Sequence, residues 1–277
     1  PFVAWDAPKA LEYLLSARPS NNNLSRYNEL FKAGEQDQLL VDSFLGSRKF
    51  GINEHSLKAL GVKDHMTHRH ALLPLMDCLN HHLNAEGFNT PLVSGQPTMR
   101  TFHVPDAKTG ELFVRYNLYD AVDTTLGYGF MDGACTWLSS VPLTLNINGQ
   151  RLNVQGLSMQ LRGPLPAALE DIRAYIPALH RKGEREATVT KLMLCMENPY
   201  SLRRVLTYLV YQLGIAHTEL VARQQVAELE RQLIEKNLQW WSGLESLTQP
   251  LPDNHAAKQL CQHSLGIIKA YQQAVGA

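Results

Sequence analysis

The hydrophobic positions follow a helical period near the amino terminus and a shorter, strand-like alternation in the middle of the chain. Residues 8–17 carry apolar side chains at helical spacing behind a proline that suits a first helical turn. Residues 24–31 and 36–44 continue this pattern on either side of Gly34, a residue that favours a helix boundary. The first part of the chain is therefore predicted to form several short helices.

Two hairpins are predicted in the middle of the chain. Between residues 101 and 116, two β-like runs flank residues 104–111, which have the composition of a loop. From Val141 to Val154, apolar and polar residues alternate on both sides of Asn148-Gly149. This dipeptide readily adopts the positive backbone angles of a tight hairpin turn, so it gives the clearest hairpin signal in the sequence.

After Pro166 the sequence returns to helical patterns. Helices are expected over residues 167–175, 187–196, 202–247 and 255–275. The fold class is therefore α+β, with a small β-rich core that carries a helical insertion and is followed by a mostly α-helical carboxyl-terminal domain.

Composition and charge exclude some classes of partner. The chain has 277 residues, of which 44% are hydrophobic, and its 26 basic residues balance 26 acidic ones. Without a basic run or a net positive charge, nucleic acid is not an expected partner. No apolar stretch approaches the roughly 20 residues needed to span a bilayer, and no secretory signal is visible, so no membrane is expected either. Four widely spaced cysteines without a CxxC pair favour reduced thiols in the cytoplasm.

The candidate chemistry lies in an ordered set of polar residues. An apolar run from residue 71 ends in Asn80-His81, and a strand-like run ends in Tyr116, with Tyr128 twelve positions later and Arg48 upstream. An asparagine side chain both donates and accepts hydrogen bonds, and a guanidinium fork matches a carboxylate. Tyrosine hydroxyls can orient an amine without adding a full charge. Each residue also has an ordinary interpretation, as a helix cap, a core side chain or a solvated arginine.

This order of motifs resembles the SET-domain protein methyltransferases of the Rubisco large-subunit methyltransferase type. The resemblance implies methyl transfer from S-adenosylmethionine to a side chain of a protein substrate, either a lysine or, as the second candidate, a histidine. It also implies roles for the residues: Arg48, Asn80 and His81 bind the cofactor, Tyr116 orients the nucleophile, and Tyr128 helps to enclose the substrate side chain.

The resemblance also implies domain boundaries. Residues 1–138 correspond to the catalytic region, with the helical insertion at 1–45 and the carboxyl-terminal half of the SET domain at 46–138. Residues 139–277 correspond to a helical substrate-binding domain. The glycine-rich cofactor segment of the family is not found in this sequence, whose first residues resemble the later part of the insertion. We expect an enzyme to have that segment upstream of Pro1.

Two alternatives remain open at this stage. Without the glycine-rich segment, the chain could be a non-catalytic protein-interaction module that uses the long amphipathic stretch 202–247. A histidine-metal hydrolase is the second alternative, because five histidines occur within eighteen residues. Their spacing matches no metal motif, and Arg69 stands among them. These histidines are His65, His68, His70, His81 and His82.

Overall fold

The computed structural model describes residues 7–19, 22–48, 50–51, 70–71, 79–83, 85, 92–93, 96–97, 102–103, 112–157 and 164–276. Its contacts divide the chain into two compact units, and each is described separately. The larger unit contains Pro1–Leu39 and Asp120–Ala277, and the smaller unit contains Leu40–Tyr119. Both helices and strands are present, so the α+β class predicted from the sequence is confirmed at this coarse level.

The division into units differs from the boundary predicted after residue 138. Strand β8 (Trp137–Ser139) pairs with β13 (Met193–Cys195), with Leu138 opposite Leu194. Both of these leucines are fully buried. Because this pairing joins the two sides of the predicted boundary, residues 120–138 belong to the same compact unit as the carboxyl-terminal part of the chain.

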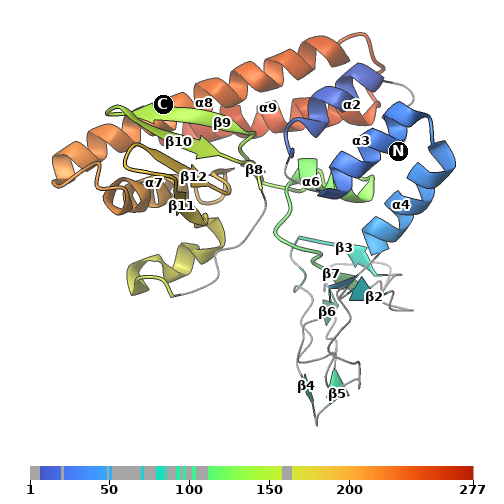
Figure 1. Cartoon of the computed structure of the whole chain (residues 1–277), viewed down its shortest axis with the longest axis horizontal. Coiled ribbons are helices and arrows are strands. Elements are labelled where there is room, and N and C mark those ends of the chain that lie inside the picture. The colour runs from blue at the N-terminus through green and yellow to red at the C-terminus, as the bar shows by residue number, and fades with distance from the viewer. Residues whose placement is uncertain are drawn as a thin grey trace. The chain divides into compact units, whose positions relative to one another are not determined.

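A four-stranded sheet forms one layer of the larger unit (Figure 1). Its order is β11-β12-β10-β9, with an antiparallel β9–β10 hairpin, a parallel β10–β12 pair and an antiparallel β11–β12 pair. Asn148 and Gly149 both have positive φ angles, 47° and 74°, so the predicted tight hairpin is confirmed. The strands are β9 (Leu143–Ile147), β10 (Gln150–Val154), β11 (Leu179–Arg181) and β12 (Glu186–Val189).

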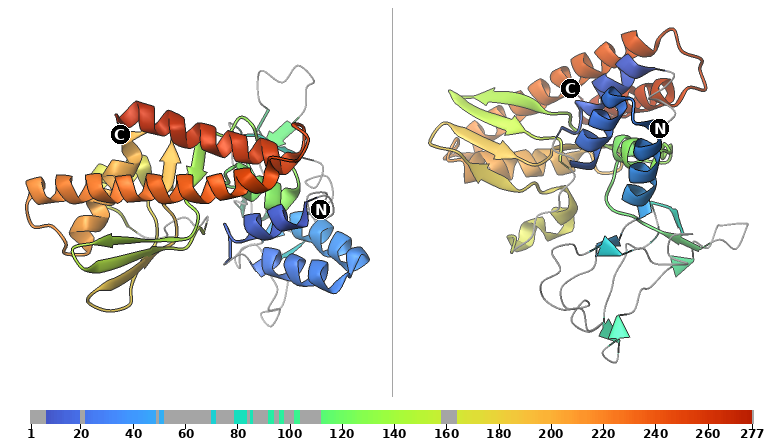
Figure 2. Two further views of the ribbon diagram at one scale, coloured as in Figure 1. Left: turned by 90° about the horizontal axis from the view of Figure 1, so that it is seen from above. Right: turned by 45° about the vertical axis from the view of Figure 1, so that its right-hand side comes forward.

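Three helices, α7, α8 and α9, pack together beside the sheet. Helix α8 packs against both α7 and α9, and it also contacts β9 (Figure 2). The helices are α7 (Tyr200–Gln212), α8 (Glu219–Thr248) and α9 (Ala256–Val275).

None of the described helices is long and apolar enough to cross a membrane. Three cysteines, Cys135, Cys195 and Cys261, are buried free thiols, whereas Cys78 lies outside the described residues.

Helix α2, from the first part of the chain, packs against α8. The Tyr13 hydroxyl in α2 donates to the Trp240 carbonyl (2.9 Å), and the two rings lie 4.6 Å apart. Trp241 is fully buried. The adjacent tryptophans therefore pack between helices rather than forming an exposed patch. The short helices of the larger unit are α2 (Pro8–Leu15), α3 (Asn22–Ala33) and α6 (Ala121–Tyr128).

One helix prediction in the carboxyl-terminal part was wrong, and a second predicted stretch is divided into two helices. Residues 187–196 contain the end of β12 and all of β13 rather than a helix, because Thr188 and Val189 are β-branched and pack well on a pleated surface. All of residues 187–195 are buried, so no polar alternation marks these strands. The stretch 202–247 forms two helices, which Gly214 separates at a φ of 68°. Ala167–Tyr175 is a 3₁₀ helix, η2.

The smaller unit consists of short strands after the last turns of α4 (Gln36–Arg48). Strands β6 and β7 pair antiparallel, which confirms the first predicted hairpin, although its loop at 104–111 lies outside the described residues. The described sheets have the strand orders β1-β2, β3-β7-β6 and β4-β5. These strands are β1 (Phe50–Gly51), β2 (His70–Ala71), β3 (Asn80–His81), β4 (Leu92–Val93), β5 (Gln96–Pro97), β6 (Phe102–His103) and β7 (Leu112–Val114).

A buried lysine makes the stability of the larger unit depend on pH. Lys191 is 1% exposed, and its ammonium donates to the Ala174 carbonyl (2.8 Å). Burial lowers the pKa of Lys191 to about 8, against the opposing effect of the Asp123 and Asp120 carboxylates. Between pH 8 and 9.5 the unfolded chain therefore keeps a proton that the folded chain releases.

We expect the free energy of unfolding to gain up to about 1.4 kcal/mol per pH unit from this group as the pH rises from 8 to 9.5. Urea denaturation at pH 7.5, 8.5 and 9.5 measures this gain. Lys191→Met should lack it, whereas Lys269→Met, at an exposed position on α9, should retain it. An equal rise in Lys191→Met would contradict the assignment.

Candidate functional site

The pairing of β3 with β7 brings two of the sequence motifs together. The strands run parallel, with Asn80 opposite Phe113 and His81 opposite Val114. The pairing extends by one residue, since the His82 N–H donates to the Val114 carbonyl (3.1 Å). The Asn-His pair and the segment that leads to Tyr116 are therefore neighbours in one sheet, although about 35 residues separate them in the sequence.

Two hydrogen bonds hold Tyr116 against the end of β3. Its backbone N–H donates to His81 Nδ1 (3.1 Å), and its hydroxyl donates to the Leu79 carbonyl (2.7 Å). The rings of His81 and Tyr116 lie 5.2 Å apart. Because Nδ1 accepts a hydrogen bond, a neutral His81 carries its proton on Nε2. His81 thus fixes the backbone that presents the tyrosine.

The direction of the tyrosine hydrogen bond matters for chemistry. A phenol that donates its proton can still accept hydrogen bonds, because its oxygen carries lone pairs. The Leu79 carbonyl fixes the orientation of the O–H bond, so the phenolic oxygen can present its acceptor side to an amine. Tyr116 is half-buried, which allows contact with a second molecule.

Asn80 and Arg48 occupy different elements of the smaller unit. The Asn80 side chain is exposed on β3, where its amide could reach a bound molecule. Arg48 ends α4, where its guanidinium lies 4.0 Å from the centre of the Phe44 ring and donates to Ser47 Oγ (3.3 Å). Both side chains can therefore bind an amino acid-like group, Asn80 through its amide and Arg48 through a cation.

Tyr128 belongs to the larger unit. It is the last residue of α6, which ends at Gly129 in the left-handed conformation (φ 80°). The Tyr128 and Phe130 rings lie 6.3 Å apart. Of the five predicted site residues, Asn80, His81 and Tyr116 thus lie together on β3 and the segment after β7, while Arg48 and Tyr128 lie on the helices α4 and α6.

A buried cluster of charges anchors the start of α6. Arg18 is 3% exposed, and it pairs with Asp120 (2.7 Å) and Asp123 (2.8 Å). Asp120 caps α6, and its carboxylate also accepts a hydrogen bond from the Ser139 N–H (2.7 Å). Burial raises the pKa of Asp120 to about 6, although the charge of Arg18 opposes this rise.

Three of these features were not predicted from the sequence. The Leu79 carbonyl that accepts from Tyr116 is a backbone group, so no residue type could reveal it. Asp120 and Asp123 had a usable signal, because two acidic residues three positions apart at the start of a helix can form a capping box. The role of Arg18 depends on a contact across about 100 residues, which the sequence pattern does not contain.

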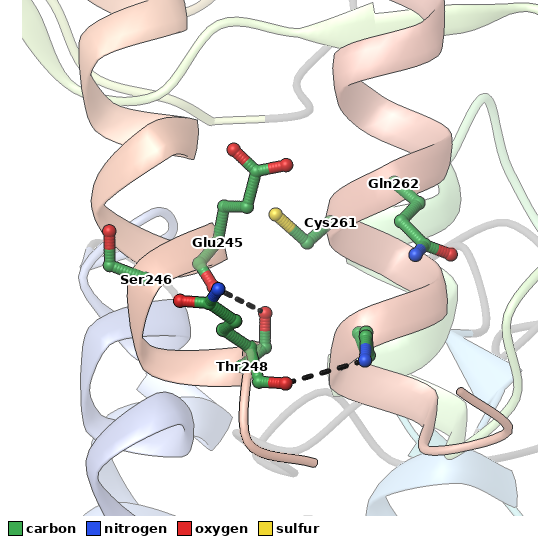
Figure 3. Close-up of a pocket in the computed structure, with 7 residues that line it drawn as sticks. Glu245, Ser246, Thr248, Cys261 and Gln262 are labelled. Carbon is green, nitrogen blue, oxygen red and sulfur yellow. Dashed lines mark hydrogen bonds between the residues drawn. The ribbon is translucent and has the colours of Figure 1, made fainter. Parts of the chain in front are cut away.

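A small polar cavity between α8 and α9 does not contain any of the predicted site residues (Figure 3). Its volume is about 270 Å³. Burial and the nearby Glu245 charge raise the pKa of the Cys261 thiol to about 12, so this thiol remains protonated and is a poor nucleophile. The lining residues are Glu245, Ser246, Thr248, Gln249, Lys258, Cys261 and Gln262.

The predicted histidine cluster is only partly covered by the structure. His65 and His68 lie outside the described residues. Within the described ranges, no three histidine, cysteine, aspartate or glutamate side chains come together in a group that could hold a metal ion.

The contact between His81 and Tyr116 leads to a prediction about positioning. For the methyl transfer that the sequence predicts, His81→Leu should lower kcat roughly tenfold, because the Tyr116 backbone loses its acceptor. His81→Asn should restore much of the rate, since the asparagine Oδ1 can replace Nδ1 as an acceptor. Steady-state kinetics of both variants measure this effect, and equal rates for the two would contradict it.

No protein-family model matches the chain, and no curated protein matches it.

Proposed function

We propose that this chain is an S-adenosylmethionine-dependent protein methyltransferase that acts on a lysine, with histidine as the second candidate target. We also propose that residues 46–138 are the second half of a SET-like catalytic core and that residues 139–277 are a substrate-binding domain. The observation that carries the proposal is the pairing of β3 with β7, which joins the Asn-His pair to Tyr116.

The polar residues of the smaller unit fit the amino acid end of the cofactor. The exposed Asn80 amide can donate to a carboxylate or accept from an ammonium group, and the Arg48 guanidinium matches a carboxylate in shape and charge. The His81 ring is engaged by the Tyr116 backbone, so we assign it the task of fixing that segment, and we assign cofactor contact to the adjacent backbone. The chemistry that the bound cofactor supplies is a methyl group on a sulfonium.

Tyr116 is the candidate for orienting the nucleophile. A lysine side chain has an unperturbed pKa near 10.4, so the site must favour its neutral form before it can attack. A phenolic oxygen accepts a hydrogen bond from the amine without a full negative charge, so it holds the nitrogen without stabilising the ammonium strongly. Alignment of this kind can contribute about 7 to 11 kcal/mol to lowering a barrier in well-oriented cases.

Calorimetry tests the cofactor part of the proposal. The gene product from its natural start should bind S-adenosylmethionine and S-adenosylhomocysteine saturably, and Asn80→Ala should abolish this binding. Asn254→Ala is the matched control, since Asn254 is exposed in the loop between α8 and α9. If the natural gene product binds neither compound, the enzyme proposal fails and a non-catalytic interaction module takes its place.

A further inference from the structure

The two edges of the four-stranded sheet differ. At the β9 edge, the Asn146 N–H donates to Gln232 Oε1 (3.0 Å), and Gln232 Nε2 donates to the Asn146 carbonyl (2.8 Å). The Gln232 side chain on α8 thus occupies the main-chain N–H and carbonyl groups that a neighbouring strand would otherwise bond. The β9 edge is therefore protected against strand pairing at this position.

The β11 edge presents main-chain groups instead. In the ladder with β12, the Lys182 N–H donates to the Glu186 carbonyl (2.9 Å), and the Thr190 N–H donates to the Ala178 carbonyl (3.1 Å). Antiparallel ladders alternate, so residues 178, 180 and 182 bond to β12. The main-chain groups of Leu179 and Arg181 consequently point away from β12, and β11 is the last strand in the described order of this sheet.

Basic side chains lie on β11, in the turn that follows it and on β10. His180, Arg181 and Lys182 are consecutive and exposed, and Arg185 is exposed across the turn. Arg151 is exposed on β10, two strands away from β11, and its backbone N–H donates to the Arg185 carbonyl (2.8 Å). Two acidic residues, Glu184 and Glu186, lie among the three arginines and the lysine, and Glu186 accepts a hydrogen bond from Asn153 (2.8 Å). The charge that remains near the edge is positive.

We propose that β11 is a docking edge for an extended, acidic segment of a partner protein, which adds to the sheet as a fifth strand. Main-chain bonds to Leu179 and Arg181 would supply the affinity common to strand addition, and the cations would select acidic side chains. This inference concerns the larger unit only and requires no cofactor, so it stands or falls independently of the proposed methyl transfer.

Fluorescence polarisation with defined peptides tests both parts of the inference. The probe is a labelled ten-residue peptide of alternating glutamate and threonine. We expect saturable binding that weakens as salt increases, and no saturable binding of the same peptide with lysine in place of glutamate. A glutamate peptide with alternate backbone nitrogens methylated keeps its charge but cannot pair as a strand, and it should bind at least about tenfold more weakly.

Matched charge variants locate the surface. Lys182→Glu with Arg185→Glu should weaken binding of the acidic peptide by about tenfold or more, because both cations become anions. Arg223→Glu with Lys269→Glu makes the same charge change on α8 and α9 and should bind normally. Thermal melts monitored by circular dichroism confirm that both double variants are folded. Absence of binding, equal binding by the two double variants, or full binding of the methylated peptide would overturn the inference. The basic side chains would then only guard the edge against pairing.

Discussion

Tyr116→Phe is expected to lower methyl transfer by about tenfold to a thousandfold, because aligned polar groups in such sites contribute several kcal/mol to transition-state stabilisation. The ring is retained, and only the hydroxyl that donates to the Leu79 carbonyl is lost. The stability cost should therefore be about 1 kcal/mol, typical of one net hydrogen bond. Affinity for the cofactor should change much less, because we assign cofactor binding to Asn80 and to the backbone near His81. Rates, calorimetry and thermal melts separate the three effects.

Tyr175→Phe is the matched control for the loss of a tyrosine hydroxyl. Tyr175 lies in η2, and its hydroxyl is 3.7 Å from Cys195 Sγ. We expect this variant to keep its methyl-transfer rate. If Tyr116→Phe also retained the full rate, the nucleophile would be oriented by Tyr128 or by a group outside this region.

Arg18→Met is expected to be the most destabilising single change in the larger unit, at about 3 to 5 kcal/mol. The substitution keeps an apolar stem but leaves Asp120 and Asp123 without the guanidinium that pairs with both. Asp120 is fully buried, so water cannot replace the lost cation. Urea denaturation at pH 7.5 measures the loss.

An exposed ion pair supplies the control for Arg18→Met. Lys32 pairs with Glu12 at 3.2 Å, and both side chains are more than half exposed, so Lys32→Met should cost less than about 1 kcal/mol. Acid should partly rescue Arg18→Met, because the buried Asp120 carboxylate, once it has lost the guanidinium, takes up a proton more readily in the folded state than in the unfolded chain. The deficit relative to the wild type should therefore shrink from pH 7.5 to pH 5. A constant deficit would show that lost packing, rather than charge, causes it.

Local sequence determined the elements whose signals are contained in a few residues. Asn148-Gly149 fixed the β9–β10 hairpin because few other residues adopt two successive positive φ angles, and the alternation around it set the buried face of both strands. The amphipathic periods at residues 8–17 and 255–275 likewise predicted α2 and α9. The Asn-His pair and Tyr116 could be selected as candidates because their chemistry is visible in the residue types.

Tertiary structure decided everything that depends on contacts between distant residues. Residues 187–195 carry no alternation because both faces of β12 and β13 are buried, so only their pairing with β10 and β8 shows that they are strands. The bond from Tyr116 to the Leu79 carbonyl joins backbone to side chain across 37 residues, and the Arg18 pair with Asp120 spans 102. A local pattern cannot encode such contacts, because their free energy arises only when the chain has folded and water has been excluded from between them.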